Sequence, residues 1–173
     1  SVIAHTLEEC IAAADELVRE VFAEAGLPAG VLNVLTHEPG EAQPIGDELI
    51  EPIYRCYRST VDRHVWGRQY LNRAFFELLV QRFRHRLCFV VARQEGVLIA
   101  GTANLVKGDT LYGRYWGALR DLRHLHFNVC YYAAIALCLR RGLTRFEPGA
   151  GGEFKHLRGF DARPTLSMHF VSD

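Results

Sequence analysis

The chain has 173 residues, of which 49% are hydrophobic and 23% are charged. This size fits one globular domain over residues 1–173 and is too small for two full ones. No apolar run approaches the roughly 20 residues that a membrane span requires. Residues 1–15 lack the basic start and apolar stretch of a signal peptide. We therefore predict a cytoplasmic protein without a membrane span.

The formal net charge of zero conceals a division of charge along the chain. Residues 1–52 contain eleven Asp or Glu and one basic residue, Arg19, for a net charge of −10. Residues 53–173 contain nineteen Lys or Arg and nine acids, for a net charge of +10. This asymmetry indicates either an anionic partner for the basic part or an electrostatic match between the two parts of the chain.

Helical periodicity dominates the first half of the chain. Thr6 and Glu9 form a capping box before the first helix. Asn72 is the expected N-cap of the third, and Pro52 is expected to mark the true first turn of the second. The expected elements are a helix over Leu7–Ala25, a strand over Val31–Thr36, a loop over 37–46, and helices over Asp47–His64 and Arg73–Arg84.

Strand patterns follow, interrupted by one long amphipathic helix. The expected strands are Leu87–Arg93, Val97–Val106, Thr110–Ala118, Leu143–Glu147 and Thr165–Val171. The long helix covers Phe127–Arg141 and ends at Gly142, and a short helical stretch covers Glu153–Arg158. The first three strands are joined by short turns, so they form an antiparallel meander. The order predicts an α/β fold with a mixed central sheet and flanking helices.

Several stretches of residues 53–173 resemble one bacterial family. They are Tyr57–Asp62, Trp66–Arg68, Phe75–Leu79, Gly108–Gly117, Leu125–Phe127, Cys130–Tyr132, Gly142–Lys155 and Arg158–Phe160. Together they are similar to predicted N-acyltransferases labelled FemAB-like peptidoglycan-biosynthesis proteins. The order of elements is similar to the GNAT acyltransferase fold. Members of that family usually carry a second acyltransferase-like half before this one, and a homodimer would supply such a half here.

The front of the chain has a different resemblance. Residues 21–52, and Glu24–Thr36 in particular, are similar to a short piece of an aldehyde dehydrogenase cofactor domain. None of the motifs for that chemistry is present in the sequence, so the resemblance implies only a structural contribution. The segment is expected to supply the first strand of the acyltransferase-like domain.

The family resemblance implies transfer of an acyl or aminoacyl group to a small-molecule amine. Acyl-CoA and aminoacyl-tRNA are the two candidate donors. GNAT enzymes hold coenzyme A with a glycine-containing loop before the central helix, whereas residues 118–125 contain no glycine. The basic surplus of residues 53–173 suits tRNA. The alternative is a non-catalytic binding or interaction module that retains the acyltransferase fold.

Two residues are the expected catalytic groups. His126 stands at the start of the central helix and is a candidate general base or anion contact, with a capping or packed histidine as the alternative. Glu147 closes a strand and is a candidate base or amine-binding acid. Its alternative role is a salt bridge with Arg114 or Arg145.

Seven further residues are assigned to substrate binding, each with a purely structural alternative. Arg114 and Trp116 are expected to share one face of their strand, with Tyr115 on the other. Lys155 and Arg158 lie three apart on one helical face, where they suit phosphate or carboxylate. The set is Arg114, Trp116, Tyr131, Lys155, Arg158, Asp62 and Trp66. The histidine and cysteine spacings predict no metal site.

Overall fold

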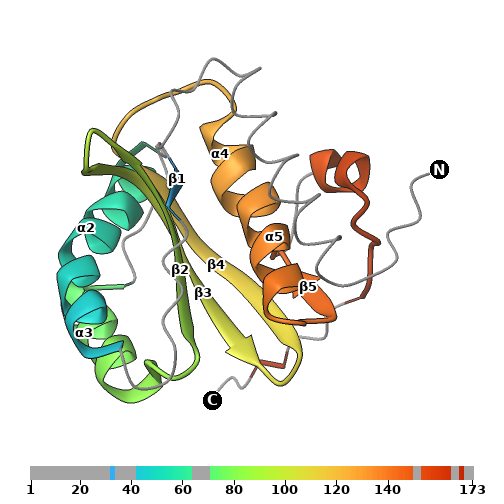
Figure 1. Cartoon of the computed structure of the whole chain (residues 1–173), viewed down its shortest axis with the longest axis horizontal. Helices are drawn as coiled ribbons and strands as arrows, with labels where there is room; N and C mark the ends of the chain where they lie inside the picture. Colours follow the sequence, from blue (N-terminus) through green and yellow to red (C-terminus); the bar gives the residue numbers. More distant parts are fainter. Residues whose placement is uncertain (1–31, 34–41, 64–70, 150–152, 165–167, 170–173) are drawn as a thin grey trace.

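The computed structural model describes residues 32–33, 42–63, 71–149, 153–164 and 168–169. Within these ranges the chain forms a five-stranded sheet in the order β1-β2-β3-β4-β5, with helices on both faces (Figure 1). The strands are β1 (Leu32–Asn33), β2 (Leu87–Gln94), β3 (Val97–Lys107), β4 (Thr110–Ala118) and β5 (Arg145–Glu147). The helices are α2 (Ala42–Arg63), α3 (Arg73–Phe83), α4 (Leu125–Phe127), η1 (Asn128–Tyr132), α5 (Ala133–Arg140) and η2 (Glu153–Arg158). The predicted mixed α/β class is confirmed.

The antiparallel meander is confirmed and consists of β2, β3 and β4. At the β2–β3 turn, Glu95 and Gly96 have φ values of 52° and 79°. Two consecutive residues with positive φ give the turn twist that matches the twist of the paired strands. β5 then pairs with β4 in parallel, after a helical crossover, so the sheet is mixed.

Helix α2 corrects two predictions. It begins at Ala42, within the expected loop over residues 37–46, and Pro52 lies in its interior instead of its first turn. The stripe Leu49, Ile53 and Cys56 is at most 2% exposed, and its burial against the sheet offsets the backbone hydrogen bond that a proline removes. Asn72 caps α3 as predicted, since its Oδ1 accepts a hydrogen bond of 3.0 Å from the Phe75 N–H.

The central helix is irregular, which the sequence did not predict. It begins at Leu125, two residues earlier than expected, and contains the π-helical turn η1 between α4 and α5. Its end is as predicted: Gly142 has φ 64°, and the Leu143 N–H donates to the Cys138 carbonyl at 2.8 Å. This pair of features is the Schellman arrangement, which satisfies carbonyls that the helix leaves open.

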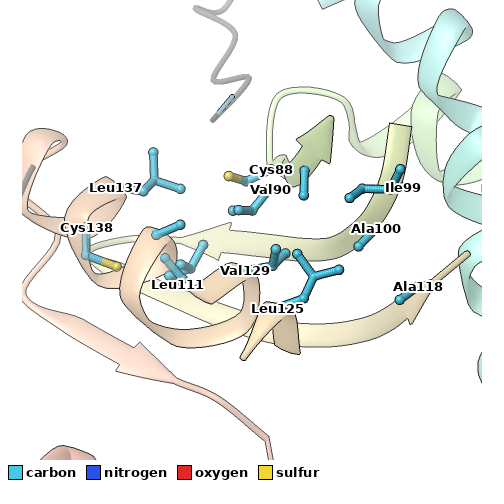
Figure 2. Close-up of a cluster of buried hydrophobic side chains, with 13 residues drawn as sticks. Cys88, Val90, Ile99, Ala100, Leu111, Ala118, Leu125, Val129, Leu137 and Cys138 are labelled. Carbon is cyan, nitrogen blue, oxygen red and sulfur yellow. The ribbon is translucent and has the colours of Figure 1, made fainter. Parts of the chain in front are cut away.

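A hydrophobic core lies on each face of the sheet. The core beneath α4, η1 and α5 combines β2 and β4 residues such as Val90 and Leu111 with Val129 and Leu137 of the helix (Figure 2). The core beneath α2 and α3 is rich in aromatic rings. Burial raises the pKa of the Cys56 thiol to about 12, which agrees with the structural role predicted for cysteines. No helix in the described ranges is long and apolar enough to cross a membrane.

Helix α2 packs directly on the C-terminal end of β4. The Thr60 hydroxyl donates to the Trp116 carbonyl at 2.8 Å, and the Ser59 hydroxyl donates to the Ala118 carbonyl at 2.9 Å. A Cβ atom placed on Gly117 would stand 1.7 Å from the Cys56 carbonyl oxygen. The glycine is therefore what allows the helix backbone to approach the strand this closely.

Three predicted elements fall mainly outside the described residues. The helix over 7–25 is outside them entirely, and only Leu32–Asn33 of the strand over 31–36 is described, as β1. Of the last predicted strand, over 165–171, only Met168 and His169 are described, and neither belongs to a strand.

Candidate functional site

His126 lies in α4 and is surrounded by aromatic rings. Its ring centroid is 5.1 Å from that of Trp116, 5.3 Å from Phe127, 5.7 Å from Tyr131 and 6.1 Å from Phe154. We call these five residues the His126 cluster. Its members come from β4, α4, η1 and η2, so the cluster forms only when the segment after β5 returns to the start of the central helix.

Two cations border the His126 cluster. The Arg158 guanidinium carbon lies 3.8 Å from the centroid of the Phe127 ring, which is a close cation–π contact. Arg158 also donates to the Phe154 carbonyl at 2.7 Å, and the Lys155 ammonium donates to the Gly149 carbonyl at 2.6 Å. The cation–π contact joins η2 to the start of the central helix, and the two hydrogen bonds lie within η2 and between η2 and the loop before it.

The surroundings of His126 favour its neutral form. Burial, and then the charges of Arg158 and Lys155, lower the pKa of the His126 imidazole from its ordinary value of 6.5. Burial raises the pKa of the Tyr131 phenol, so it stays protonated. Near neutral pH the cluster therefore holds an imidazole that can accept a proton and a phenol that can donate one.

The π-helical turn next to His126 contains an unusual buried side chain. Asn128 is 0% exposed, and neither its Nδ2 nor its Oδ1 has a hydrogen-bond partner in the structure as described. Turn η1 contacts β2 and β3, and the side chains of Thr102 and Asn104 on β3 are also buried. π-helical turns occur often at functional sites, and unpaired buried amides are rare in proteins.

The pairing of strand β4 with β3 is interrupted at Arg114. Tyr115 pairs with Ala103 and Gly113 with Asn104, so Arg114 is the extra residue of a β-bulge. Pairing with β5 ends at Tyr112 and Glu147. The bulge interrupts strict alternation, so the shared direction of Arg114 and Trp116 stays a prediction. The opposite directions of Tyr115 and Trp116 are confirmed, since they pack in the cores on opposite faces.

The structure brings together five of the nine predicted site residues. His126, Trp116 and Tyr131 belong to the His126 cluster, and Lys155 and Arg158 border it. Exposed Arg114 and Glu147 have no ring contact or ion pair with the cluster in the described part of the chain. Asp62 forms an ion pair of 3.4 Å with Arg58 instead. Trp66 lies outside the described residues.

Sequence reasoning missed several residues at this site. Phe127 and Phe154 contribute rings to the His126 cluster, and Phe160 extends it through a 5.7 Å contact with Tyr131. One local signal was available, because Phe127 and Tyr131 lie four apart on the same helix face. Asn128 was also visible as a lone amide within an apolar helix.

Comparison with known proteins identifies the family. Residues 33–173 match the FemAB-like family, described as peptidoglycan biosynthesis/recognition. The chain therefore belongs to this family. The match begins at residue 33 and so includes part of segment 21–52, and no comparison supports the predicted resemblance of that segment to aldehyde dehydrogenase.

One solved structure with a similar chain trace is an aminoglycoside acetyltransferase, HMB0005, from an uncultured soil metagenomic sample. It is 12% identical, with a TM-score of 0.48, and the alignment covers 82% of this chain and 98% of that one. No curated protein matches the sequence.

Proposed function

We propose that this domain transfers an acyl or aminoacyl group to the nitrogen of a small amine, with His126 as the proton acceptor. The observation that carries the proposal is the half-buried imidazole, whose pKa is lowered by burial and by two cations. An amine that attacks a carbonyl carbon must lose a proton as the C–N bond forms. A neutral imidazole accepts that proton, which then passes to the leaving oxygen or sulfur as its bond to carbon breaks.

The outer edge of β4 offers a donor for the carbonyl oxygen that becomes negative during this reaction. The Trp116 carbonyl points outward, to Thr60, and the N–H of the same strand residue points to the same side. The Trp116 ring contacts His126. We assign the Trp116 N–H to the developing oxyanion, because a fixed backbone donor stabilises that charge in the transition state.

The donor is proposed to be anionic. Lys155 and Arg158 both place positive charge near His126, and both lower the pKa of its imidazole. Acyl-CoA and aminoacyl-tRNA both carry phosphate groups that such cations bind. Buried, reduced Cys56, Cys88 and Cys138 suit the cytoplasmic setting that we propose for a single domain over residues 1–173, acting alone or as a homodimer.

The test replaces His126 with Gln and measures transfer from acyl-CoA and from aminoacyl-tRNA to a panel of primary amines. We expect kcat/KM to fall by about 10²- to 10⁴-fold, the usual contribution of a general base. The matched control is His156→Gln, because His156 is an exposed histidine on η2. If both variants retain the wild-type kcat/KM, His126 is not the proton acceptor.

A second candidate function is ligand binding without catalysis. In the described part of the chain, neither a hydrogen bond nor an ion pair joins a carboxylate to His126, and the shift of its pKa comes only from burial and cations. Many catalytic histidines are oriented by such a carboxylate. Calorimetric binding of acyl-CoA by a wild-type protein that transfers nothing to any amine would support this alternative.

A further inference from the structure

The central helix changes its phase at the π-helical turn η1. The Ala133 N–H donates to the Asn128 carbonyl, five residues earlier, whereas an α-helix joins residues four apart. The turn therefore takes up one residue more than an α-helical turn does. As a result, the part of the helix before η1 is rotated relative to α5 by one residue, or about 100°. This rotation is a property of the backbone, and it does not depend on the proposed transfer reaction.

Burial along the helix follows the shifted phase. Leu125, Val129 and Leu137 are each at most 1% exposed, and all three belong to the core beneath the helix (Figure 2). Counted along the chain, Val129 and Leu125 precede Leu137 by 8 and 12 residues, or about 2.2 and 3.3 turns of an α-helix. When η1 takes up one residue, the separations become about 7 and 11 residues, close to two and three whole turns. The π-helical turn therefore aligns the three side chains toward the sheet.

The same phase shift brings two side chains of the His126 cluster together. His126 and Tyr131 are five residues apart, and residues with that spacing in an α-helix point in directions about 140° apart. Their ring centroids are nevertheless 5.7 Å apart in the structure. The contact between the imidazole and the phenol therefore depends on η1.

The phase shift also places an amide in the core. Asn128 precedes Leu137 by nine residues, about 2.5 turns of an α-helix, so in an uninterrupted helix it would face away from the sheet. In the structure Asn128 is 0% exposed, and neither polar atom of its amide has a hydrogen-bond partner among the described residues. Burial of an unpaired amide is unfavourable. Asn128 therefore disfavours η1 relative to an uninterrupted helix.

We propose that the central helix exchanges between the π-helical form of the structure and a minor, uninterrupted α-helical form, and that Asn128 keeps the minor form accessible. In the minor form the Asn128 amide reaches water, whereas Leu125 turns away from the sheet and loses its burial, which keeps this form minor. His126, eleven residues or about 3.1 turns before Leu137, turns beneath the helix. It loses its contact with Tyr131, so the exchange withdraws the imidazole from the candidate site. Only η1 and the three residues of α4 need to move.

The experiment is fluorine NMR relaxation dispersion on protein that carries 5-fluorotryptophan. The chain contains two tryptophans, and Trp66→Phe in every sample leaves Trp116 as the one fluorinated ring. The Trp116 ring centroid is 5.1 Å from that of His126, so its resonance changes when His126 moves. Motions of this kind occur in microseconds to milliseconds, the range that relaxation dispersion detects. No substrate is present, so the result is independent of the transfer reaction.

We expect dispersion at Trp116 from a minor form populated at about 0.1–10%. Asn128→Leu should abolish it, because an apolar side chain favours the buried position of η1. Asn128→Asp should raise the ratio of minor to major form about tenfold, because a carboxylate is less favourable to bury than an amide of the same shape. The matched control is Thr110→Val, which removes a polar group that is 4% exposed on β4, outside the helix. It should leave the dispersion unchanged.

The exchange is disproved if Trp116 shows no dispersion with Asn128 in place, or if Asn128→Leu leaves the dispersion unchanged. A loss in Thr110→Val equal to that in Asn128→Leu would also disprove it. If Asn128→Asp does not fold, deletion of Cys130 replaces it. The deletion removes one residue from η1, so an uninterrupted α-helix forms with the alignment toward the sheet unchanged and His126 and Tyr131 four residues apart. The dispersion should then vanish while the nuclear Overhauser effect between these two rings remains. Dispersion that persists after the deletion would overturn the proposal, because it would come from motion of the rings and not from the helix.

Discussion

Two aromatic clusters stand on opposite faces of the sheet and differ in their surroundings more than in their ring geometry. The first, which we call the α2–α3 cluster, consists of Tyr54, Tyr57, Phe75, Phe76 and Tyr115, with ring centroids 5.4 to 6.5 Å apart. The His126 cluster has separations of 5.1 to 6.2 Å. Contact between rings therefore does not distinguish a core from a candidate site.

The kinds of ring and a stacked cation do distinguish them. Phe76 is 2% exposed and Tyr57 is 5% exposed, and the cluster that they form holds only hydrocarbon rings and phenols. Four of the five residues of the His126 cluster are half-buried and Tyr131 is 3% exposed. The cluster contains an imidazole and has Arg158 stacked on one ring. Adjacent residues of β4, Tyr115 and Trp116, supply one ring to each cluster, because consecutive strand residues point to opposite faces.

The largest expected effect is on the free energy of unfolding, when one ring is removed from each cluster in turn. Phe76→Ala removes a fully buried ring and is expected to lower the free energy of unfolding by about 3–5 kcal/mol. Phe154→Ala removes a half-buried ring and is expected to cost about 1–2 kcal/mol. Urea unfolding followed by circular dichroism measures both. If both variants lose the same free energy of unfolding, the His126 cluster stabilises the fold as much as the α2–α3 cluster does.

The second largest effect on the free energy of unfolding is expected at the contact between α2 and β4, beside the α2–α3 cluster. Gly117→Ala places a methyl group against the Cys56 backbone, and we expect the free energy of unfolding to fall by about 3 kcal/mol. Gly101→Ala is the matched control. Its closest new contact would be the end of the Ile53 side chain, at 2.6 Å, followed by the Val91 side chain at 3.3 Å and the Val90 carbonyl oxygen at 3.4 Å. The Ile53 side chain can move aside, so we expect a cost of about 1 kcal/mol. A larger loss from Gly101→Ala would contradict this account of the α2 contact.

A smaller effect of opposite sign is expected at Asn128, beside the His126 cluster. Asn128→Leu replaces an unpaired buried amide with an apolar group of similar volume and is expected to raise the free energy of unfolding by about 1 kcal/mol. Asn128→Ala, which leaves a cavity, is the control and is expected to lower it. A loss of stability in Asn128→Leu would reveal a hydrogen-bonding partner for the amide, such as an enclosed water molecule.

Local signals in the sequence predicted most of the fold in the described residues. The Asn72 cap, the Glu95–Gly96 turn and the Gly142 helix end each specify a backbone conformation through one to three neighbouring residues. The π-helical turn at Asn128 and the β-bulge at Arg114 have no such signal, because they adjust one element to the packing of others. The early start of α2 was missed because Pro44 and Gly46 are typical of loops.

The candidate site could be predicted only in part. His126 was identified because it starts the central helix. Phe154 is 28 residues further along the chain than His126, so no spacing rule links the two rings. Glu147 was chosen for its place at a strand end, but a carboxylate at a strand end becomes catalytic only if the fold turns it toward the reacting atoms, and Glu147 is exposed.

The smallest expected effect tests whether the cations of the His126 cluster act on its histidine. The folded-state pKa of His126 lies below its ordinary value of 6.5, so the unfolded chain binds more protons between the two values. The contribution of His126 to stability is therefore complete above pH 6.5 and is lost as the pH falls toward the folded-state pKa. Arg158→Gln removes one cause of the lowering and is expected to raise the pKa of His126 in an NMR titration. The pKa should remain below 6.5, because burial is the largest cause. An unchanged pKa would mean that the Arg158 charge does not reach the imidazole, and the stacked cation would then not distinguish the two clusters electrostatically.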